Sequence, residues 1–262
     1  MAALSSSLVE VTDAELPAPP RRPSRDATRG GRVARRRTLS PQAITDAALA
    51  IVDREGLDAL TMRTLAKSLG TGPASLYAHV ASKDELLEML MERVLAEIRL
   101  PEAPDPEHWF EQLLAIGRDI RRVWSAHRDL ARASFARIPL GPNALRVSES
   151  MLGMMRAGGL SDRAIGLGTD LFALYVGAVA YEESLQTFDQ WTPEQVAEYV
   201  GDLRRYFESL PAGRFPNLIA LAGAMTEAGG EERFEFGLEI LIRGLIAVSA
   251  DEAGAELSPP LR

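Results

Sequence analysis

The sequence predicts an all-α protein with a small N-terminal helical domain and a larger C-terminal helical domain. After residue 39, apolar residues recur at three- and four-residue spacing through most of the chain, as on one face of an amphipathic helix. Clusters of Gly and Pro interrupt this pattern between the segments, and no segment alternates strictly between apolar and polar residues. We therefore expect helices joined by short breaks, without a sheet.

Residues 1–38 are expected to form a disordered basic arm. They are rich in Pro, Ser, Ala and Arg and hold few large apolar residues, so they cannot bury enough surface to fold alone. Eight arginines lie between residues 21 and 37, including the run Arg35, Arg36 and Arg37. Such an arm neutralises phosphates and adds affinity for a polyanion without selecting a sequence.

Charge divides the chain into a basic and an acidic part. Residues 21–83 carry 12 Arg and Lys against 5 Asp and Glu, a net charge of +7, whereas residues 84–262 carry 17 against 29, a net charge of −12. This asymmetry indicates that only the N-terminal part meets a polyanion, although a basic tail without a partner is the alternative.

The composition excludes several classes of protein. The chain has no cysteine, which rules out disulfides, thiolate metal sites and cysteine nucleophiles. Its N-terminus lacks the pattern of a secretory signal, and no run approaches eighteen uncharged apolar residues. We expect a cytoplasmic protein with no membrane partner.

Residues 39–83 are predicted to form a three-helix domain. Ser40 and Pro41 suit the cap and first position of a first helix, which Gly56 ends. Thr61 is the predicted cap of a short second helix that ends at Gly70.

A third short helix is predicted to begin at Pro73, with Leu76 as its apolar anchor. Two short helices joined by a turn that contains glycine form a helix-turn-helix unit. The N-terminal domain is therefore predicted to bind DNA through its third helix.

Residues 84–250 are predicted to form a helical regulatory and dimerisation domain, followed by a tail at 251–262. Ser82 and Glu85 form a capping-box pattern ahead of a fourth helix over 83–100. The same pattern of Gly and Pro breaks predicts the later helices at about 107–126, 128–136, 142–157, 161–188, 193–209, 215–228 and 231–249.

The predicted recognition helix offers short or polar side chains on its outer side. Arg63 has a guanidinium group suited to guanine in the major groove, and backbone N–H groups at an open helix start bind phosphate. Each residue alone has a structural alternative, since Tyr77 could be a partly buried aromatic residue and Arg63 a solvated charge. The candidates on the third helix are Gly72, Pro73, Ala74, Ser75, Tyr77 and His79.

The segment "AALAIVDREGLDALTMRTLAKSLGTGPASLYAHVASKDELLEML" resembles the DNA-binding domain of TetR-family transcriptional regulators over residues 40–95. The resemblance implies a homodimer on double-stranded operator DNA. It departs at Pro73, where the tetracycline-repressor branch often has a polar reader. It also implies phosphate contacts for Tyr77, His79 and Lys83, positions near base edges for Arg63 and Ser75, and a DNA-backbone contact for Thr61.

Two later segments, "HWFEQLLAIGRDIRRVWSAHRDLARASF" and "ERFEFGLEILIRGL", resemble the regulatory domain of the tetracycline-repressor branch. This resemblance implies that the last helix and the helix ending near residue 187 build a four-helix bundle between two subunits. The expected interface residues are Phe236, Leu241 and Leu245.

Apolar stripes in the C-terminal domain favour either a plain core or a ligand cavity. A helical body joined to a DNA-binding domain favours the cavity, because ligands bind between bundle helices. We expect a hydrophobic small-molecule inducer, aromatic or polyketide-like, contacting Trp124, Ser134, Met151, Met155, Phe172 and Tyr175.

No metal and no other cofactor are predicted. The tetracycline-repressor branch has a metal-binding imidazole beyond its His-Arg-Asp segment, but this chain has Ala133, Ser134 and Phe135 there. His127 is the last histidine of the chain and has no helical ligand spacing with His108.

The sequence therefore predicts a ligand-responsive transcriptional regulator, a repressor that its inducer releases from the operator. An enzyme and a helical scaffold with a merely structural helix-turn-helix are the alternatives. The enzyme is disfavoured because Gly166-Leu167-Gly168 lacks the third glycine and the preceding strand of a dinucleotide site, and no catalytic constellation stands out.

Overall fold

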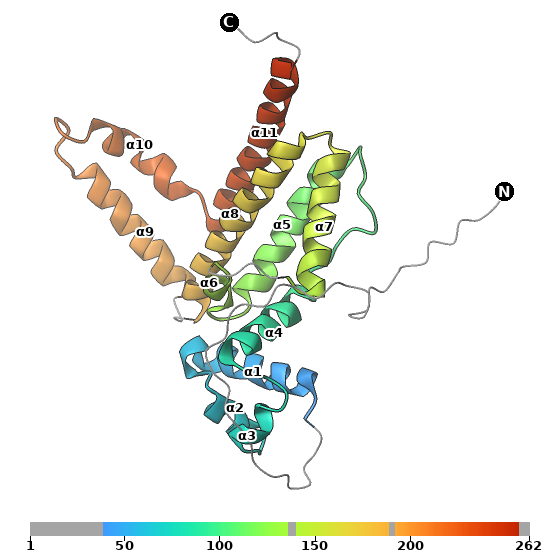
Figure 1. Cartoon of the computed structure of the whole chain (residues 1–262). Coiled ribbons are helices and arrows are strands. Elements are labelled where there is room, and N and C mark those ends of the chain that lie inside the picture. Colours follow the sequence, from blue (N-terminus) through green and yellow to red (C-terminus); the bar gives the residue numbers. More distant parts are fainter. Residues whose placement is uncertain (1–38, 136–139, 189–191, 257–262) are drawn as a thin grey trace, which may run out of the picture.

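The computed structural model describes residues 39–135, 140–188 and 192–256, and these ranges contain helices and no strand (Figure 1). The predicted all-α fold is confirmed. Residues 39–82 form a head at one end of the molecule, and residues 101–256 belong to a larger body. The predicted arm at 1–38, with Arg35, Arg36 and Arg37, lies outside the described residues.

The head contains three α-helices and one short 3₁₀ helix. Ser40 caps the first helix, since its hydroxyl accepts a hydrogen bond of 3.1 Å from the backbone N–H of Ala43. Gly56 ends this helix with φ of +86°, a conformation that favours glycine. The elements are α1 (Pro41–Glu55), η1 (Leu57–Ala59), α2 (Met62–Ser68) and α3 (Pro73–Leu76).

The predicted second and third helices begin where the sequence places them. The hydroxyls of Thr61 and Thr64 each accept a hydrogen bond from the other residue's backbone N–H, at 3.1 and 2.9 Å. Gly70 turns the chain after α2 with φ of +64°. Leu76 and Val80 are fully buried and anchor the α3 region to the rest of the head.

Helix α4 (Lys83–Leu95) joins the head to the body. Ser82 caps it through a hydrogen bond of 3.1 Å from the N–H of Glu85. The helix is shorter than the predicted range of 83–100. After Leu95 the backbone continues in tighter three-residue hydrogen bonds, and the backbone N–H of Arg99 then donates to Asp119 on the next helix, at 2.7 Å.

The body contains seven helices in the described residues. Their positions agree with the predicted ranges, except that α6 is shorter and α11 runs seven residues further than expected. They are α5 (Trp109–Ser125), α6 (Leu130–Ser134), α7 (Pro142–Ala157), α8 (Asp162–Phe188), α9 (Pro193–Glu208), α10 (Pro216–Glu227) and α11 (Gly230–Glu256).

Helix α8 is the central helix of the body and packs against α5, α6, α7 and α11. By length and composition alone, its segment Asp162–Leu185 is apolar enough to cross a membrane. The contacts with four neighbouring helices give it the role of a core helix in this fold. That position accounts for only part of its apolar composition, because Leu167, Leu171, Leu174 and Leu185 are exposed.

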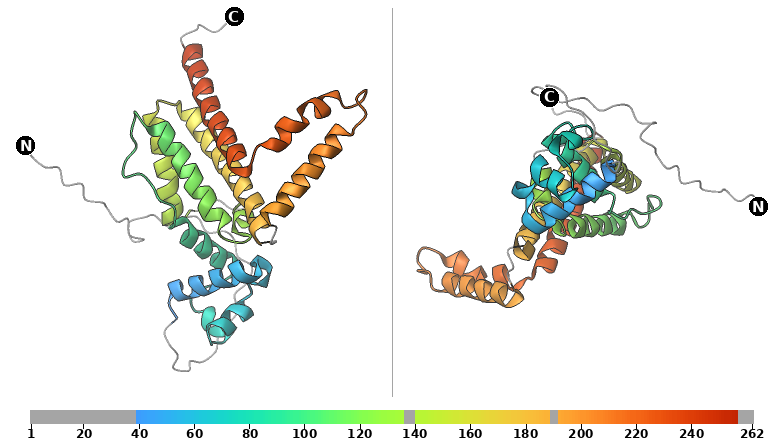
Figure 2. Two further views of the ribbon diagram at one scale, coloured as in Figure 1. Left: turned by 180° about the vertical axis from the view of Figure 1, so that it is seen from behind. Right: turned by 90° about the horizontal axis from the view of Figure 1, so that it is seen from below.

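Helices α9 and α10 form an arm that projects from the body (Figures 1 and 2). They pack mainly on each other. No residue of α9 is buried, and Ala222 is the one buried residue of α10. This arm exposes large apolar side chains, namely Tyr199, Tyr206, Leu221 and Met225.

A buried carboxylate fixes the link between head and body. Asp119 on α5 accepts hydrogen bonds from the backbone and side chain of Arg99 and from the side chain of Arg122. Burial alone raises the pKa of Asp119, but the hydrogen bonds from Arg122 and Arg99 outweigh it and lower the pKa to about 2. The ionised form is therefore the one that stabilises the folded chain.

We expect Asp119→Asn to lower the midpoint of thermal unfolding. A pKa lowered from 3.8 to about 2 corresponds to about 2 kcal/mol at neutral pH, or roughly 4–8 °C for a chain of this size. The contribution is present above the unfolded pKa and is lost as the pH falls from about 4 to about 2, so the difference should shrink there. Asp202→Asn, at an exposed pair with Arg205, is the control and should change little.

Candidate DNA interface and ligand-binding core

The outer side of α3 and the residues after it are exposed at the end of the molecule away from the body (Figure 1). Tyr77 is 54% exposed, and His79, Pro73 and Ala74 are also exposed, whereas Gly72 and Ser75 are half-buried. Four of the six predicted contact residues of this helix are thus accessible.

Arg63 and Lys83 are exposed at the starts of α2 and α4. Thr61 is exposed as well, but its hydroxyl is hydrogen-bonded to Thr64 in the cap of α2. If Thr61 contacts DNA, its hydroxyl therefore has to do so while it also caps α2.

Four of the six predicted ligand residues lie in the apolar core of the body. Trp124 on α5, Met151 and Met155 on α7, and Phe172 on α8 are buried. The core is tight here, because a Cβ at Gly117 on α5 would lie 3.0 Å from the Phe172 ring. All four side chains belong to the continuous apolar core, at different levels along the helices.

The two polar ligand candidates are engaged within the chain. The hydroxyl of Tyr175 lies 3.1 Å from the backbone oxygens of Arg233 and Phe234 and donates to them, and its ring stacks on that of Phe234. Ser134 donates to the backbone oxygen of Ala131 at 2.7 Å. A ligand that uses either hydroxyl has to compete with these bonds.

An open hollow of about 700 Å³ lies at the end of the body away from the head. It contains none of the predicted ligand residues. Its walls come from the α7–α8 turn and the C-terminal half of α11, namely Gly158, Gly159, Leu160, Ser161, Asp162, Arg163, Ile246, Ser249, Ala250 and Glu252.

The predicted interface residues on α11 lie on different sides of the helix. Phe236 is 68% exposed and Leu241 is half-buried against the core. Leu245 is only 8% exposed and packs on Gly168 of α8 in the same chain, which leaves little of its side chain for a partner subunit. The apolar residues exposed along α8 and α11 are Leu167, Leu171, Leu174, Leu185, Phe236, Ile240, Ile246 and Val248.

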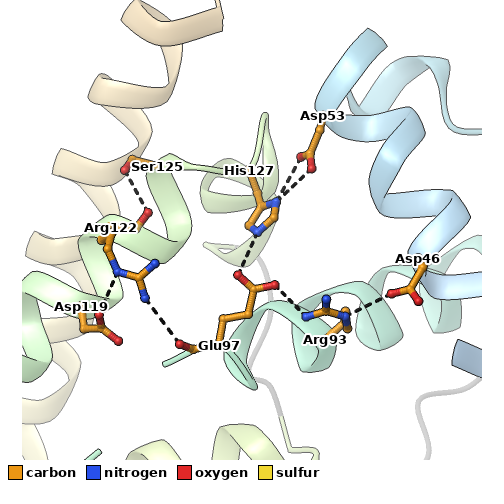
Figure 3. A network of polar contacts seen from close by, with 8 residues as sticks. All are labelled: Asp46, Asp53, Arg93, Glu97, Asp119, Arg122, Ser125 and His127. Carbon is orange, nitrogen blue, oxygen red and sulfur yellow. Dashed lines mark hydrogen bonds and ion pairs between the residues drawn. The ribbon is translucent and has the colours of Figure 1, made fainter. Parts of the chain in front are cut away.

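Polar side chains connect the head to the body around the α5–α6 turn (Figure 3). His127 lies between Asp53 of α1 and Glu97, which follows α4. Arg93 binds both Glu97 and Asp46 of α1. This network was missed from the sequence.

A second polar connection joins α4 to the start of α7. The carboxylate of Glu92 accepts hydrogen bonds from the backbone N–H groups of Asn143 and Ala144, at 2.8 and 3.1 Å. Arg146 donates to two backbone oxygens near the end of α4, at 3.1 Å each. Neither of these contacts was predictable from the sequence. Asp119, which lies between Ile116 and Ile120 on a buried helix face, was a detectable signal of its own contacts with Arg99 and Arg122.

Taken together, an exposed helix-turn-helix head on a helical body with an apolar core defines a DNA-binding transcriptional regulator with a regulatory domain. Residues 44–90 match the family model described as bacterial regulatory proteins of the tetR family, and residues 101–249 match the tetracyclin repressor-like C-terminal domain. The chain belongs to the TetR family.

Relatives of known class agree with this assignment. The HTH-type transcriptional repressor DrrR1 of Streptomyces coeruleorubidus is 31% identical over 83% of this chain and 81% of its own length. The class A tetracycline repressor of Escherichia coli is 29% identical, over 79% of this chain and 90% of its own length.

Solved structures of ActR from Streptomyces coelicolor are similar over the whole fold. The apo form has a TM-score of 0.74 at 44% identity, covering 83% of this chain and all of ActR. The complex of ActR with actinorhodin has a TM-score of 0.74 at 46% identity, covering 81% and 97% of the two chains. This chain is a ligand-responsive DNA-binding regulator of the repressor type, in a family whose members act as dimers.

We expect Tyr77→Ala to weaken operator binding without destabilising the chain. An exposed hydroxyl that donates to a phosphate contributes about 1.5–3 kcal/mol, so affinity should fall by roughly 10- to 150-fold in an anisotropy titration. Tyr199→Ala removes a ring of similar exposure, 57%, from α9 and should leave the affinity unchanged. A loss of several degrees in the unfolding midpoint of the Tyr77 variant would instead make this residue structural.

Proposed function

We propose that this regulator is a cytoplasmic homodimeric repressor whose inducer is a largely hydrophobic, aromatic or polyketide-like small molecule. The observation that carries the inducer class is the composition of the core between α5, α7 and α8. Trp124, Met151, Met155 and Phe172 are all buried among the apolar residues of these helices, a setting that does not suit a charged ligand.

The adaptability of this core supports the proposal. Methionine side chains are flexible and fill irregular shapes, so Met151 and Met155 suit a cavity that forms around a ligand. ActR, which shares 46% identity with this chain, has been solved with actinorhodin, and a further structure of ActR contains (S)-DNPA. A ligand of comparable kind is the best-supported class for this chain.

On DNA, the exposed groups of the head divide into two roles. Tyr77, His79 and Lys83 bind phosphates, and Arg63 and Ser75 lie near base edges. Two such heads enter successive major grooves, which are about 34 Å apart, so specific binding requires a dimer. The α3 start from Gly72 to Ala74 allows close approach of the backbone.

The dimer forms through the exposed apolar faces of α8 and α11. These faces lie on neighbouring helices, and each carries large side chains that a monomer leaves in water. Phe236 and Ile240 are exposed on α11.

We expect Leu171→Arg and Ile240→Arg to yield folded monomers. Both residues are exposed in the single chain, so the substitutions leave its own core intact while burying unpaired charges in the interface. Leu145→Arg on α7, which is also exposed, is the matched control and should remain dimeric. Light scattering measures the oligomeric state, and circular dichroism measures the helical fold. Dimers in both variants at micromolar concentration would place the interface elsewhere.

We expect Met155→Ala and Phe172→Ala to alter the ligand response far more than the affinity for operator without ligand. The probe is actinorhodin, titrated against the complex of the chain with DNA from its own promoter region. A coupling of about 1–3 kcal/mol corresponds to a 5- to 150-fold weaker complex when the ligand is bound. Leu221→Ala, exposed on the arm, is the control, and a normal response in both core variants would refute the proposed position of the ligand.

A further inference from the structure

The turn between α5 and α6 carries a buried histidine that contacts carboxylates from two elements (Figure 3). His127 is 9% exposed. Its Nδ1 lies 3.2 and 3.1 Å from the two carboxylate oxygens of Asp53 on α1. Its Nε2 lies 3.6 Å from Oε2 of Glu97, within ion-pair distance and beyond that of a good hydrogen bond. The imidazole ring thus bridges the head, the end of α4 and the body.

Glu97 is held in place to face the ring. Its Oε1 atom accepts a hydrogen bond of 2.6 Å from Arg93, which also binds Asp46 on α1 at 3.1 Å. Its other carboxylate oxygen is the one nearest to His127. From α5, Arg122 lies 3.5 Å from the backbone oxygen of Glu97 and pairs chiefly with Asp119.

The residues after His127 add a second contact with the head. Asp129 accepts a hydrogen bond of 2.9 Å from the backbone N–H of Leu57 and has φ of +59°, a conformation uncommon for a residue with a side chain. The side chain of Arg128 lies close to Gly56. The α5–α6 turn is therefore pressed against the end of α1, with His127 as its buried member.

The bridge is complete only when the ring carries two protons. A neutral imidazole has one N–H group, so it donates to one carboxylate and turns a lone pair toward the other. Burial lowers the pKa of His127, but the hydrogen bond and charge of Asp53 and the charge of Glu97 outweigh it and raise the pKa above the ordinary 6.5. Protonation is thus favoured by the two facing carboxylates.

We propose that His127 is a positioning residue that fixes the head on the body when protonated, so that operator affinity depends on pH. The inference rests on the proposed role of the head in binding DNA. Two heads held at a fixed separation lose less freedom on meeting successive major grooves than two heads that swing. Operator affinity is therefore expected to fall as the pH rises through the pKa of His127.

The same bridge changes the stability of the chain with pH. The pKa of His127 is raised in the folded state, so the stabilisation is fully present below the ordinary histidine pKa. It is lost as the pH rises through the folded value. A merely structural role in packing would not show this dependence.

The first test compares the thermal unfolding midpoints of the full wild-type chain and His127→Gln between about pH 5.5 and 8.5. Glutamine keeps a side-chain donor but cannot take up a second proton. We expect the unfolding midpoint of the wild type to exceed that of the variant most at low pH. The difference between the two midpoints should disappear as the pH rises. His108→Asn, which removes an exposed histidine paired with Asp105, is the control and should follow the wild type.

Histidine titrations give a direct reading of the same bridge. The chain has three histidines, so the NMR signals of the imidazole rings are assignable from single variants. We expect His127 to titrate above 6.5, and Asp53→Asn to lower its midpoint. A gap in stability that is constant with pH, or a His127 that titrates below 6.5, overturns the proposal.

The second test measures affinity for DNA from the chain's own promoter region over the same pH range. His79→Asn serves as the background, because it removes the histidine that is itself proposed to contact a phosphate. We expect affinity to fall at least about fivefold toward high pH in this background and to stay flat after His127→Gln is added. If operator affinity depends on pH in the same way with and without His127→Gln, the proposal is overturned even when the stability test agrees with it.

Failure of the proposed DNA function has a different signature. In that case neither the wild type nor any variant binds the promoter DNA at any pH, and the proposed effect of His127 on operator affinity is refuted as well. The stability and titration measurements still decide whether His127 bridges the head and body in its protonated form.

Discussion

Helix α4 is packed by the head and by the body at once, and the response of this regulator depends on that constraint. Six of its thirteen residues are buried, and it contacts α1 in the head and α5, α6 and α7 in the body. Close-packed interiors resist small displacements, so α4 cannot shift within one part without disturbing the other. A change in the body therefore reaches the DNA-binding head as a movement of this helix.

Polar contacts fix α4 along its length as well as around its axis. Glu92 satisfies backbone N–H groups at the start of α7, and Arg146 satisfies backbone oxygens at the end of α4. Helix ends carry these unsatisfied groups and the charges that complement them. Because α7 also carries Met151 and Met155, one helix contacts α4 at its start and the apolar core further along. We infer that α7 is a short physical route from the ligand to the head.

The sequence predicted what depends on local chemistry and missed what depends on distant partners. The caps at Ser40 and Thr61 were predictable because they involve residues three positions away. The hydrogen bond from the backbone N–H of Arg99, just after α4, to Asp119 was not predictable, because the two residues are twenty positions apart. In the candidate site, α11 carries both buried and exposed apolar residues. The resemblance to the family therefore did not show that Leu245 packs on α8 of the same chain. The contact of His127 with Asp53 was not predictable, because the two residues are 74 positions apart in the sequence.

The closed core sets the conditions under which a ligand can act. Met155 and Phe172 are fully buried, so a ligand that enters between α7 and α8 has to separate helices that are packed together. The cost of this separation is met by burying the apolar surface of the ligand itself. A ligand shifts the balance of two arrangements only by its difference in affinity for them. A molecule that bound on the surface of the closed body without opening it would leave α4 in place and the operator occupied, however tightly it bound. Under the proposed mechanism, release from DNA therefore requires a ligand large and apolar enough to hold the core open.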